Sequence, residues 1–144
     1  MVMMFRSLHH VPVDQMDTAF REIHRVLRPG GHVYISEPVF AGEFNDLARI
    51  YNDEESVRSA AFDATCRAAD KGLFEFVSET FFLTRLQYRD FAAFAKKHLE
   101  STHSVRNVTD EQKNAVEQLF NAYLGPDGAN LTQQVRADLM RKPG

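Results

Sequence analysis

The spacing of apolar residues predicts alternating strands and helices in the first forty residues. Residues 2–5 form a continuous apolar run, which is typical of a strand buried on both faces in a parallel sheet. Over residues 16–27 apolar side chains recur every three or four positions, which predicts an amphipathic helix that stops at Pro29. Residues 32–37 are rich in β-branched and aromatic residues and predict a second strand. Strand, helix and strand with short turns make a βαβ unit, so we expect parallel strands and an α/β fold.

The pattern after residue 40 is mostly helical at first. Residues 43–71 keep helical spacing with a charged break at residues 53–55, which predicts two helices and a solvated junction between them. Residues 74–88 are dense in β formers without proline or glycine and predict a strand. Residues 91–99 predict a short helix, and the polar residues 101–107 predict a loop.

The last third of the chain predicts one helix and one strand. Thr109 and Gln112 have the spacing of a capping box before a helical stripe that ends at Gly125. From Leu131 to Leu139 apolar and polar residues alternate, which predicts a half-buried strand. Six phenylalanines in the middle of the chain are expected in the core rather than in a ligand pocket: Phe74, Phe76, Phe81, Phe82, Phe91 and Phe94.

Composition narrows the class of protein further. The chain has 144 residues, 44% of them hydrophobic and 26% charged, as in an ordinary globular domain. A net charge of −3 gives no basic field for nucleic acid, and no apolar run approaches the roughly 20 residues that span a bilayer, so neither a membrane span nor a signal peptide is expected. Cys66 is the only cysteine, which excludes an internal disulfide and a zinc site built on thiolates, and favours a reducing cytoplasm.

Three segments are recognisable together: residues 7–11 (Ser-Leu-His-His-Val), 22–31 (Glu-Ile-His-Arg-Val-Leu-Arg-Pro-Gly-Gly) and 33–38 (Val-Tyr-Ile-Ser-Glu-Pro). With residues 136–143 as a last strand, they resemble the second half of class I S-adenosylmethionine-dependent methyltransferases. The resemblance covers essentially the whole chain. It implies the later half of a Rossmann-like fold: a mixed sheet of about four strands, family strands 4 to 7 in the order 4, 5, 7, 6, with an antiparallel last strand and flanking helices.

In domain terms, the resemblance makes residues 1–144 a partial methyltransferase domain, in which residues 43–72 are a helical cap-like insertion on the substrate side. It implies S-adenosylmethionine as cofactor and methyl transfer to a small-molecule acceptor. The family binds the methionine part of the cofactor with an Asp/Glu-x-Gly-x-Gly loop, and an acidic residue binds the ribose. The seven glycines allow no Gly-x-Gly anywhere in the 144 residues. Most of the cofactor site is therefore expected to be absent, and the chain alone to be incomplete or inactive, as a truncated, split or degenerate form.

The candidate catalytic residues follow the two parallel strands. His9 and His10 lie at the carboxyl end of the first strand, where open α/β sheets bind ligands, and either could accept the acceptor's proton. The alternative is packing within a loop, and because neighbouring side chains diverge we expect no metal site. Glu37 ends the next strand, where it could bind a substrate hydroxyl or cation, or simply be a solvated carboxylate.

By the resemblance, Phe5, Arg6 and Ser7 would line the methionine part of the cofactor, largely through backbone groups. The strand order leaves residues 2–5 on an apolar edge, which favours a homo-oligomer or a partner chain at that edge. Two other functions stay open: a non-catalytic interaction or dimerisation module that uses this edge, and a ligand-binding α+β domain with a pocket beneath the phenylalanine-rich strand.

Overall fold

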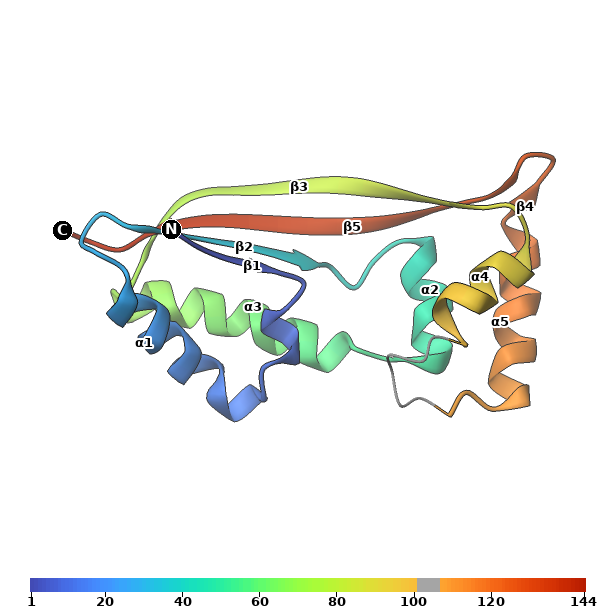
Figure 1. Cartoon of the computed structure of the whole chain (residues 1–144), viewed down its shortest axis with the longest axis horizontal. Helices are drawn as coiled ribbons and strands as arrows, with labels where there is room; N and C mark the ends of the chain where they lie inside the picture. Colours follow the sequence, from blue (N-terminus) through green and yellow to red (C-terminus); the bar gives the residue numbers. More distant parts are fainter. Residues whose placement is uncertain (101–106) are drawn as a thin grey trace. The chain divides into compact units, whose positions relative to one another are not determined.

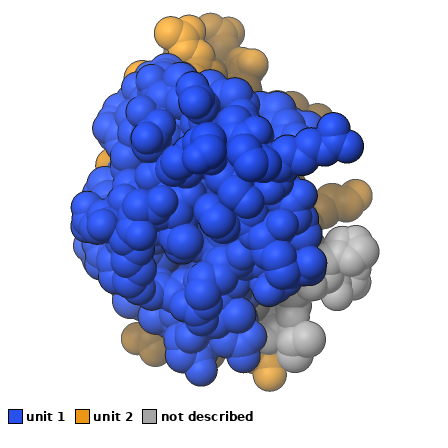
Figure 2. All heavy atoms as spheres, turned by 90° about the vertical axis from the view of Figure 1, so that its left-hand side faces the viewer, with its two compact units in different colours: residues 1–40, 54–82, 134–144 blue, residues 41–53, 83–133 orange. Residues whose placement is uncertain are grey.

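The computed structural model describes residues 1–100 and 107–144 (Figure 1). Nearly all of the predicted loop at residues 101–107 lies outside the described residues. The chain divides into two compact units (Figure 2). Unit 1 comprises residues 1–40, 54–82 and 134–144, and unit 2 comprises residues 41–53 and 83–133.

The sheet has the order β1-β2-β5-β3, with β4 paired to β5. Strand β1 (Val2–Phe5) pairs in parallel with β2 (His32–Pro38), and β5 (Gly128–Arg141) is antiparallel to β2. Strand β3 is Glu75–Tyr88, and the short β4 is Leu124–Gly125. The α/β class and the expected strand order are confirmed. The sheet has five strands rather than four, because the two residues of β4 form a hairpin with β5.

In unit 1, helices cover one face of the sheet (Figure 1). They are α1 (Met16–Val26) and α3 (Glu55–Asp70), with 3-10 turns η1 (Leu8–His10) and η2 (Val13–Gln15) before α1. The buried face of α1 carries Met16, Phe20 and Ile23 at the predicted spacing. These side chains pack with Val33 and Ile35 of β2 and with Met140 of β5, and so fix the strands whose ends form the candidate site.

The other face of β1 is not covered. Met3 and Phe5 are each 60% exposed, while Val2 and Met4 pack against the core on the helical side. The prediction that this strand is buried on both faces is therefore wrong. Phe5 contacts Tyr34 of β2, with ring centroids 5.5 Å apart.

Unit 2 contains α2 (Glu43–Tyr51), α4 (Phe91–His98) and α5 (Asp110–Ala122). The predicted capping box is present: Thr109 Oγ1 accepts from Gln112 N–H, and Gln112 Oε1 accepts from Thr109 N–H, both at 3.1 Å. Its core is aromatic and aliphatic, and includes Phe44, Leu47, Tyr88, Phe94, Val116, Phe120 and Leu131. The two helices predicted within residues 43–71 are confirmed as α2 and α3.

Two predictions about burial are wrong. Phe74 and Phe94 are buried, but Phe76, Phe81 and Phe82 on the edge strand β3 are 43%, 51% and 44% exposed. Strand β5 is not half-buried over its whole length, because it lies between β2 and β3. Its polar residues Arg136 and Asp138 are 7% and 0% exposed.

Candidate functional site

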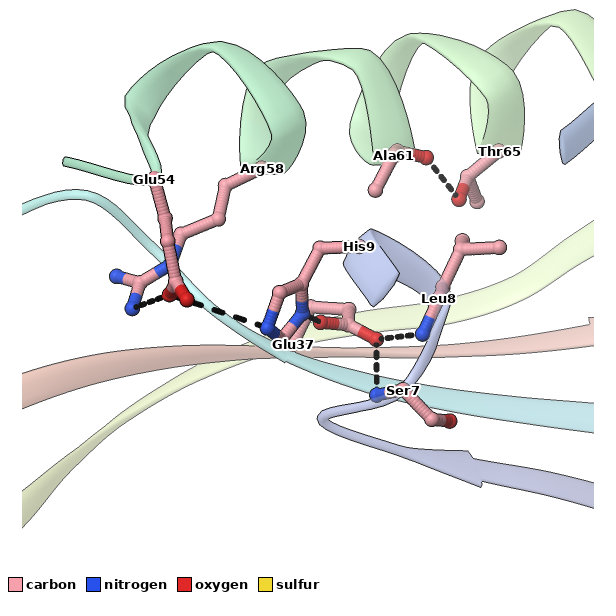
Figure 3. Close-up of polar contacts among 8 residues, drawn as sticks. All are labelled: Ser7, Leu8, His9, Glu37, Glu54, Arg58, Ala61 and Thr65. Carbon is pink, nitrogen blue, oxygen red and sulfur yellow. Dashed lines mark hydrogen bonds and ion pairs between the residues drawn. The ribbon is translucent and has the colours of Figure 1, made fainter. Parts of the chain in front are cut away.

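The carboxyl ends of the parallel strands β1 and β2 place the candidate residues next to one another in unit 1 (Figure 3). The chain leaves β1 through Arg6, whose φ of 47° turns it sharply, and Arg6 N–H donates to Ser36 O of β2 at 2.8 Å. The η1 turn then carries Leu8 and His9 against the end of β2.

Glu37 is buried at 5% exposure and holds this turn in place. Its Oε1 accepts from the backbone N–H of Ser7 at 3.0 Å and of Leu8 at 2.7 Å, and its Oε2 pairs with His9 Nδ1. A buried carboxylate is stable only when its charge is met by donors, and here three donors meet it. Both oxygens of Glu37 are thus engaged within the chain.

His9 lies between two carboxylates and is 6% exposed. Its Nδ1 faces Glu37 Oε2, and its Nε2 is 4.0 Å from Glu54 Oε2. Glu54 also accepts from Arg58 Nη2 at 2.8 Å, as Figure 3 shows. A carboxylate that accepts from Nδ1 fixes the orientation of the imidazole and leaves Nε2 as the nitrogen that can take up a proton.

His10 has a different environment from His9. It is exposed, and its ring stacks on His9 with centroids 4.1 Å apart and an interplanar angle of 42°. Of the three predicted catalytic residues, the structure therefore brings His9 and Glu37 into direct contact and leaves His10 on the surface beside them.

The residues expected at the cofactor offer fewer donors than their position suggests. Phe5 is 60% exposed, and the backbone N–H groups of Arg6 and Ser7 already donate to Ser36 O and Glu37 Oε1. The carbonyl oxygen of Ser7 is engaged as well, because it accepts from His10 N–H at 3.2 Å. An ammonium group such as that of the cofactor needs acceptors, so only carbonyl oxygens of this segment would suit it. The 144 residues contain no Gly-x-Gly loop, so the residues present fit at most this one part of the cofactor.

Three charged residues near this site were not predicted from the sequence: Glu54, Arg58 and Arg136. Glu54 was assigned to a solvated junction, but its side chain is 15% exposed and lies against Arg58 and His9. The i, i+4 spacing of Glu54 and Arg58 was the available signal. Arg136 lies opposite Glu37 in the β2–β5 register, and no local spacing in the sequence indicates this.

His98 in unit 2 is packed among aromatic rings. Its centroid is 5.1 Å from that of Phe44 and 4.9 Å from that of Phe94, and its Nε2 lies 2.6 Å from Tyr88 Oη. Burial, with a smaller contribution from Lys97, lowers the pKa of His98 to about 4. This histidine is half-buried beside the aromatic core of unit 2.

The described residues contain neither a candidate metal site nor a helix that could span a membrane. Residues 1–100 and 107–144 hold no group of three or more His, Cys, Asp or Glu side chains that could bind a metal ion. In the same residues no helix is long and apolar enough to cross a membrane.

The sheet order, with β1 parallel to β2 and β5 antiparallel to β2, defines the class of fold as a Rossmann-like α/β fold of the methyltransferase type. A family model described as a methyltransferase domain matches residues 1–35, which run from β1 through α1 into β2. This match and the shared fold confirm the resemblance to class I S-adenosylmethionine-dependent methyltransferases. A comparison with curated proteins gives no match.

Two solved structures share the fold over almost the whole chain. One is a protein of Bacillus halodurans C-125 proposed to be a methyltransferase: TM-score 0.61, 16% identity, 99% of this chain and 64% of that one covered. The other is the YcgJ protein of Bacillus subtilis: TM-score 0.57, 14% identity, 99% of this chain and 63% of that one covered. The chain thus spans less than two thirds of the length of either.

Proposed function

We propose that the chain is part of an S-adenosylmethionine-dependent methyltransferase that acts on a small molecule. The observation that carries the proposal is the His9–Glu37 pair at the carboxyl ends of adjacent parallel strands, where open α/β sheets bind ligands. The methyltransferase fold and the family match over residues 1–35 support it. The cofactor supplies an electrophilic methyl group when it is bound.

In this proposal His9 accepts the proton that the acceptor's hydroxyl or amine releases. Glu37 fixes the orientation of the ring through Nδ1, and Glu54 faces Nε2 at 4.0 Å. Glu37 is then a positioning residue, because both of its oxygens are engaged by Ser7, Leu8 and His9. His10 is the second candidate for proton transfer, since it is exposed next to His9.

We assign the methionine part of the cofactor to Phe5, Arg6 and Ser7, through carbonyl oxygens at the end of β1. The remaining cofactor contacts require a segment with a Gly-x-Gly loop, which these 144 residues do not contain. The proposal therefore includes residues 1–144 as one partial domain that is inactive by itself. Helices α2 and α3 occupy residues 43–72, which we propose as the cap. Helix α3 also contributes Arg58, which pairs with Glu54 at the site.

A second candidate function is a non-catalytic association module. The observation that favours it is the apolar, uncovered edge strand β1, with Met3 and Phe5 each 60% exposed. We propose that this edge pairs with a second copy or a partner chain. With a net charge of −3, nucleic acid is not among the proposed partners, and the single thiol of Cys66 supports a reducing, cytoplasmic setting.

The proposed function is tested by methyl transfer. The chain is co-expressed with the polypeptide encoded directly upstream, and the purified complex is incubated with methyl-labelled S-adenosylmethionine and a panel of small acids, phenols and amines. We expect label in a small-molecule product, and a rate at least tenfold lower for His9→Gln, against no change for the surface variant Glu117→Gln. A complex that binds the cofactor but methylates the panel no faster than buffer would contradict the proposal.

A further inference from the structure

Unit 1 contains a cavity of about 270 Å³ between the end of β2, strand β5 and the first turns of α3. Four charged side chains line it, Glu37, Glu55, Arg58 and Arg136, together with Ser59 and the rings of Phe40 and Phe62. Its volume lies near the lower end of the roughly 300–1,000 Å³ of small-molecule pockets, so its ligand is small. Glu37 is shared between this cavity and the His9 pair.

The guanidinium of Arg136 is held in place, but not all of its hydrogen-bond donors are used. Arg136 is 7% exposed, its Nε donates to Asp138 Oδ2 at 2.9 Å, and its central carbon lies 3.6 Å from the centroid of the Phe62 ring. Within the described residues its two terminal amino groups make no hydrogen bond. A buried guanidinium with unused donors on a cavity wall calls for oxygen acceptors inside that cavity.

Arg58 places a second positive charge on the same cavity. Its side chain is 9% exposed, it pairs with Glu54, and its guanidinium lies over the Phe40 ring at 5.6 Å. Two carboxylates, those of Glu37 and Glu55, also line the cavity. That of Glu37 is already met by three donors, which reduces its repulsion of an anion. The amino end of α3, whose residues Arg58 and Ser59 line the cavity, adds a favourable field for negative charge.

We propose that this cavity binds the carboxylate of a small aromatic or apolar acid, with Arg136 as the bidentate anchor and Phe40 and Phe62 against the body of the ligand. A carboxylate matches the planar fork of a guanidinium better than a single-point anion does. Where the proposed methyltransferase function also holds, this acid is the acceptor class, because the cavity adjoins the His9–Glu37 pair. The binding itself does not depend on that function.

The test is a titration of the 144-residue chain with benzoate, followed by amide chemical shifts in two-dimensional NMR without cofactor. We expect saturable shifts confined to the cavity residues, no such shifts with benzamide, and at least tenfold weaker benzoate binding for Arg136→Lys, which keeps the charge but loses the fork. Arg21→Lys, an exposed arginine of α1, is the matched control and should bind as the parent does. If the spectrum of Arg136→Lys shows unfolding, Arg58→Lys takes its place, with the same expected loss.

Equal binding of benzoate and benzamide, or unchanged affinity in a folded Arg136→Lys or Arg58→Lys variant, would overturn the proposal. Inorganic phosphate in a third titration distinguishes the source of the oxyanion: tighter binding of phosphate than of benzoate would overturn the carboxylate assignment. Benzoate binding without methyl transfer would refute the proposed function and leave this inference standing. Methyl transfer without benzoate binding would support the proposed function and overturn this inference.

Discussion

At the scale of single residues, the candidate site is built on the buried His9–Glu37 pair. The sequence places His9 and Glu37 after successive strands, and it could therefore predict that they lie at the same edge of the sheet. It could not predict their contact, because they are 28 residues apart and the contact depends on the η1 turn that follows the positive φ of Arg6. Nor could it reveal that two backbone N–H groups would compete for Glu37.

Removal of the Glu37 carboxylate should destabilise unit 1. Glu37→Ala leaves the buried N–H groups of Ser7 and Leu8 without an acceptor, so we expect a loss of about 3 kcal/mol in the free energy of unfolding. Glu37→Gln should lose about 1 kcal/mol, because its amide oxygen can still accept from both. Urea denaturation measures the two losses, and Glu117→Ala on the exposed face of α5 is the control. Equal stability of Glu37→Ala and the parent protein would show that the carboxylate does not hold the turn.

The half-buried His98 should make stability depend on pH below neutrality. Its folded-state pKa of about 4 lies below the ordinary value of 6.5, so between these values the unfolded chain binds a proton that the folded chain does not bind. Above about pH 6.5, His98 is neutral in both states and costs no stability. As the pH falls towards 4, His98 is protonated in the unfolded chain first, and the folded state loses stability relative to it. After allowance for solvent screening we expect a loss of about 1 kcal/mol between pH 7 and pH 5.

This dependence is measured as the difference between the parent protein and His98→Gln, which removes the titrating group. The urea midpoints at pH 7 and pH 5 should differ less in the variant than they do in the parent protein. Identical pH slopes in the two proteins would mean that His98 is protonated in the folded state as easily as in the unfolded chain.

At the scale of elements, hydrophobic spacing predicted the helices and the strands, and the family resemblance implied the order of four strands. Hydrophobic spacing failed where burial depends on which elements become neighbours. Alternation indicated a half-buried last strand, yet its polar residues Arg136 and Asp138 are buried. Arg136 lies against the Phe62 ring of α3 and donates to Asp138, contacts that the alternation could not predict. Burial, aided by nearby Glu79, raises the pKa of Asp138, and Arg136 partly offsets this. The phenylalanines of β3 are exposed because β3 is an edge strand, which composition cannot show.

The β4–β5 hairpin offers a test of backbone geometry. Gly128 has a φ of +96°, and a Cβ there would lie 2.4 Å from Tyr88 O, whereas a Cβ on Gly125 would have its nearest neighbour at 3.7 Å. Gly128→Ala should therefore cost about 2 kcal/mol or more, and Gly125→Ala in the same hairpin less than about 1 kcal/mol. Thermal or urea unfolding of the two variants measures the contrast, and equal losses would contradict the hairpin geometry.

At the scale of the whole molecule, the chain has a Rossmann-like α/β fold with an apolar edge strand. Strand β1 ends the sheet, and its outward residues Met3 and Phe5 remain exposed. Exposed apolar edge strands favour pairing with another chain. The sequence predicted this edge from the strand order, but it did not predict that one face of β1 would also be bare.

We expect the purified chain to self-associate through β1 at micromolar concentration. Met3→Lys places a charge on the bare face and should shift the sedimentation coefficient towards that of a monomer, because a buried unpaired charge is costly. Val13→Lys, at another exposed apolar residue, should leave association unchanged. A clean monomer of the parent chain at these concentrations would refute association through this edge.

The most direct test of the central claim is calorimetric titration with S-adenosylhomocysteine, of the 144-residue chain alone and of the chain co-expressed with the polypeptide encoded directly upstream. The account predicts no saturable heat for the chain alone, which has no Gly-x-Gly loop, and one-to-one binding for the complex. Saturable binding near one-to-one by the chain alone would contradict the claim that the cofactor site is incomplete. The absence of binding by both proteins, when both are folded, would contradict the methyltransferase function itself.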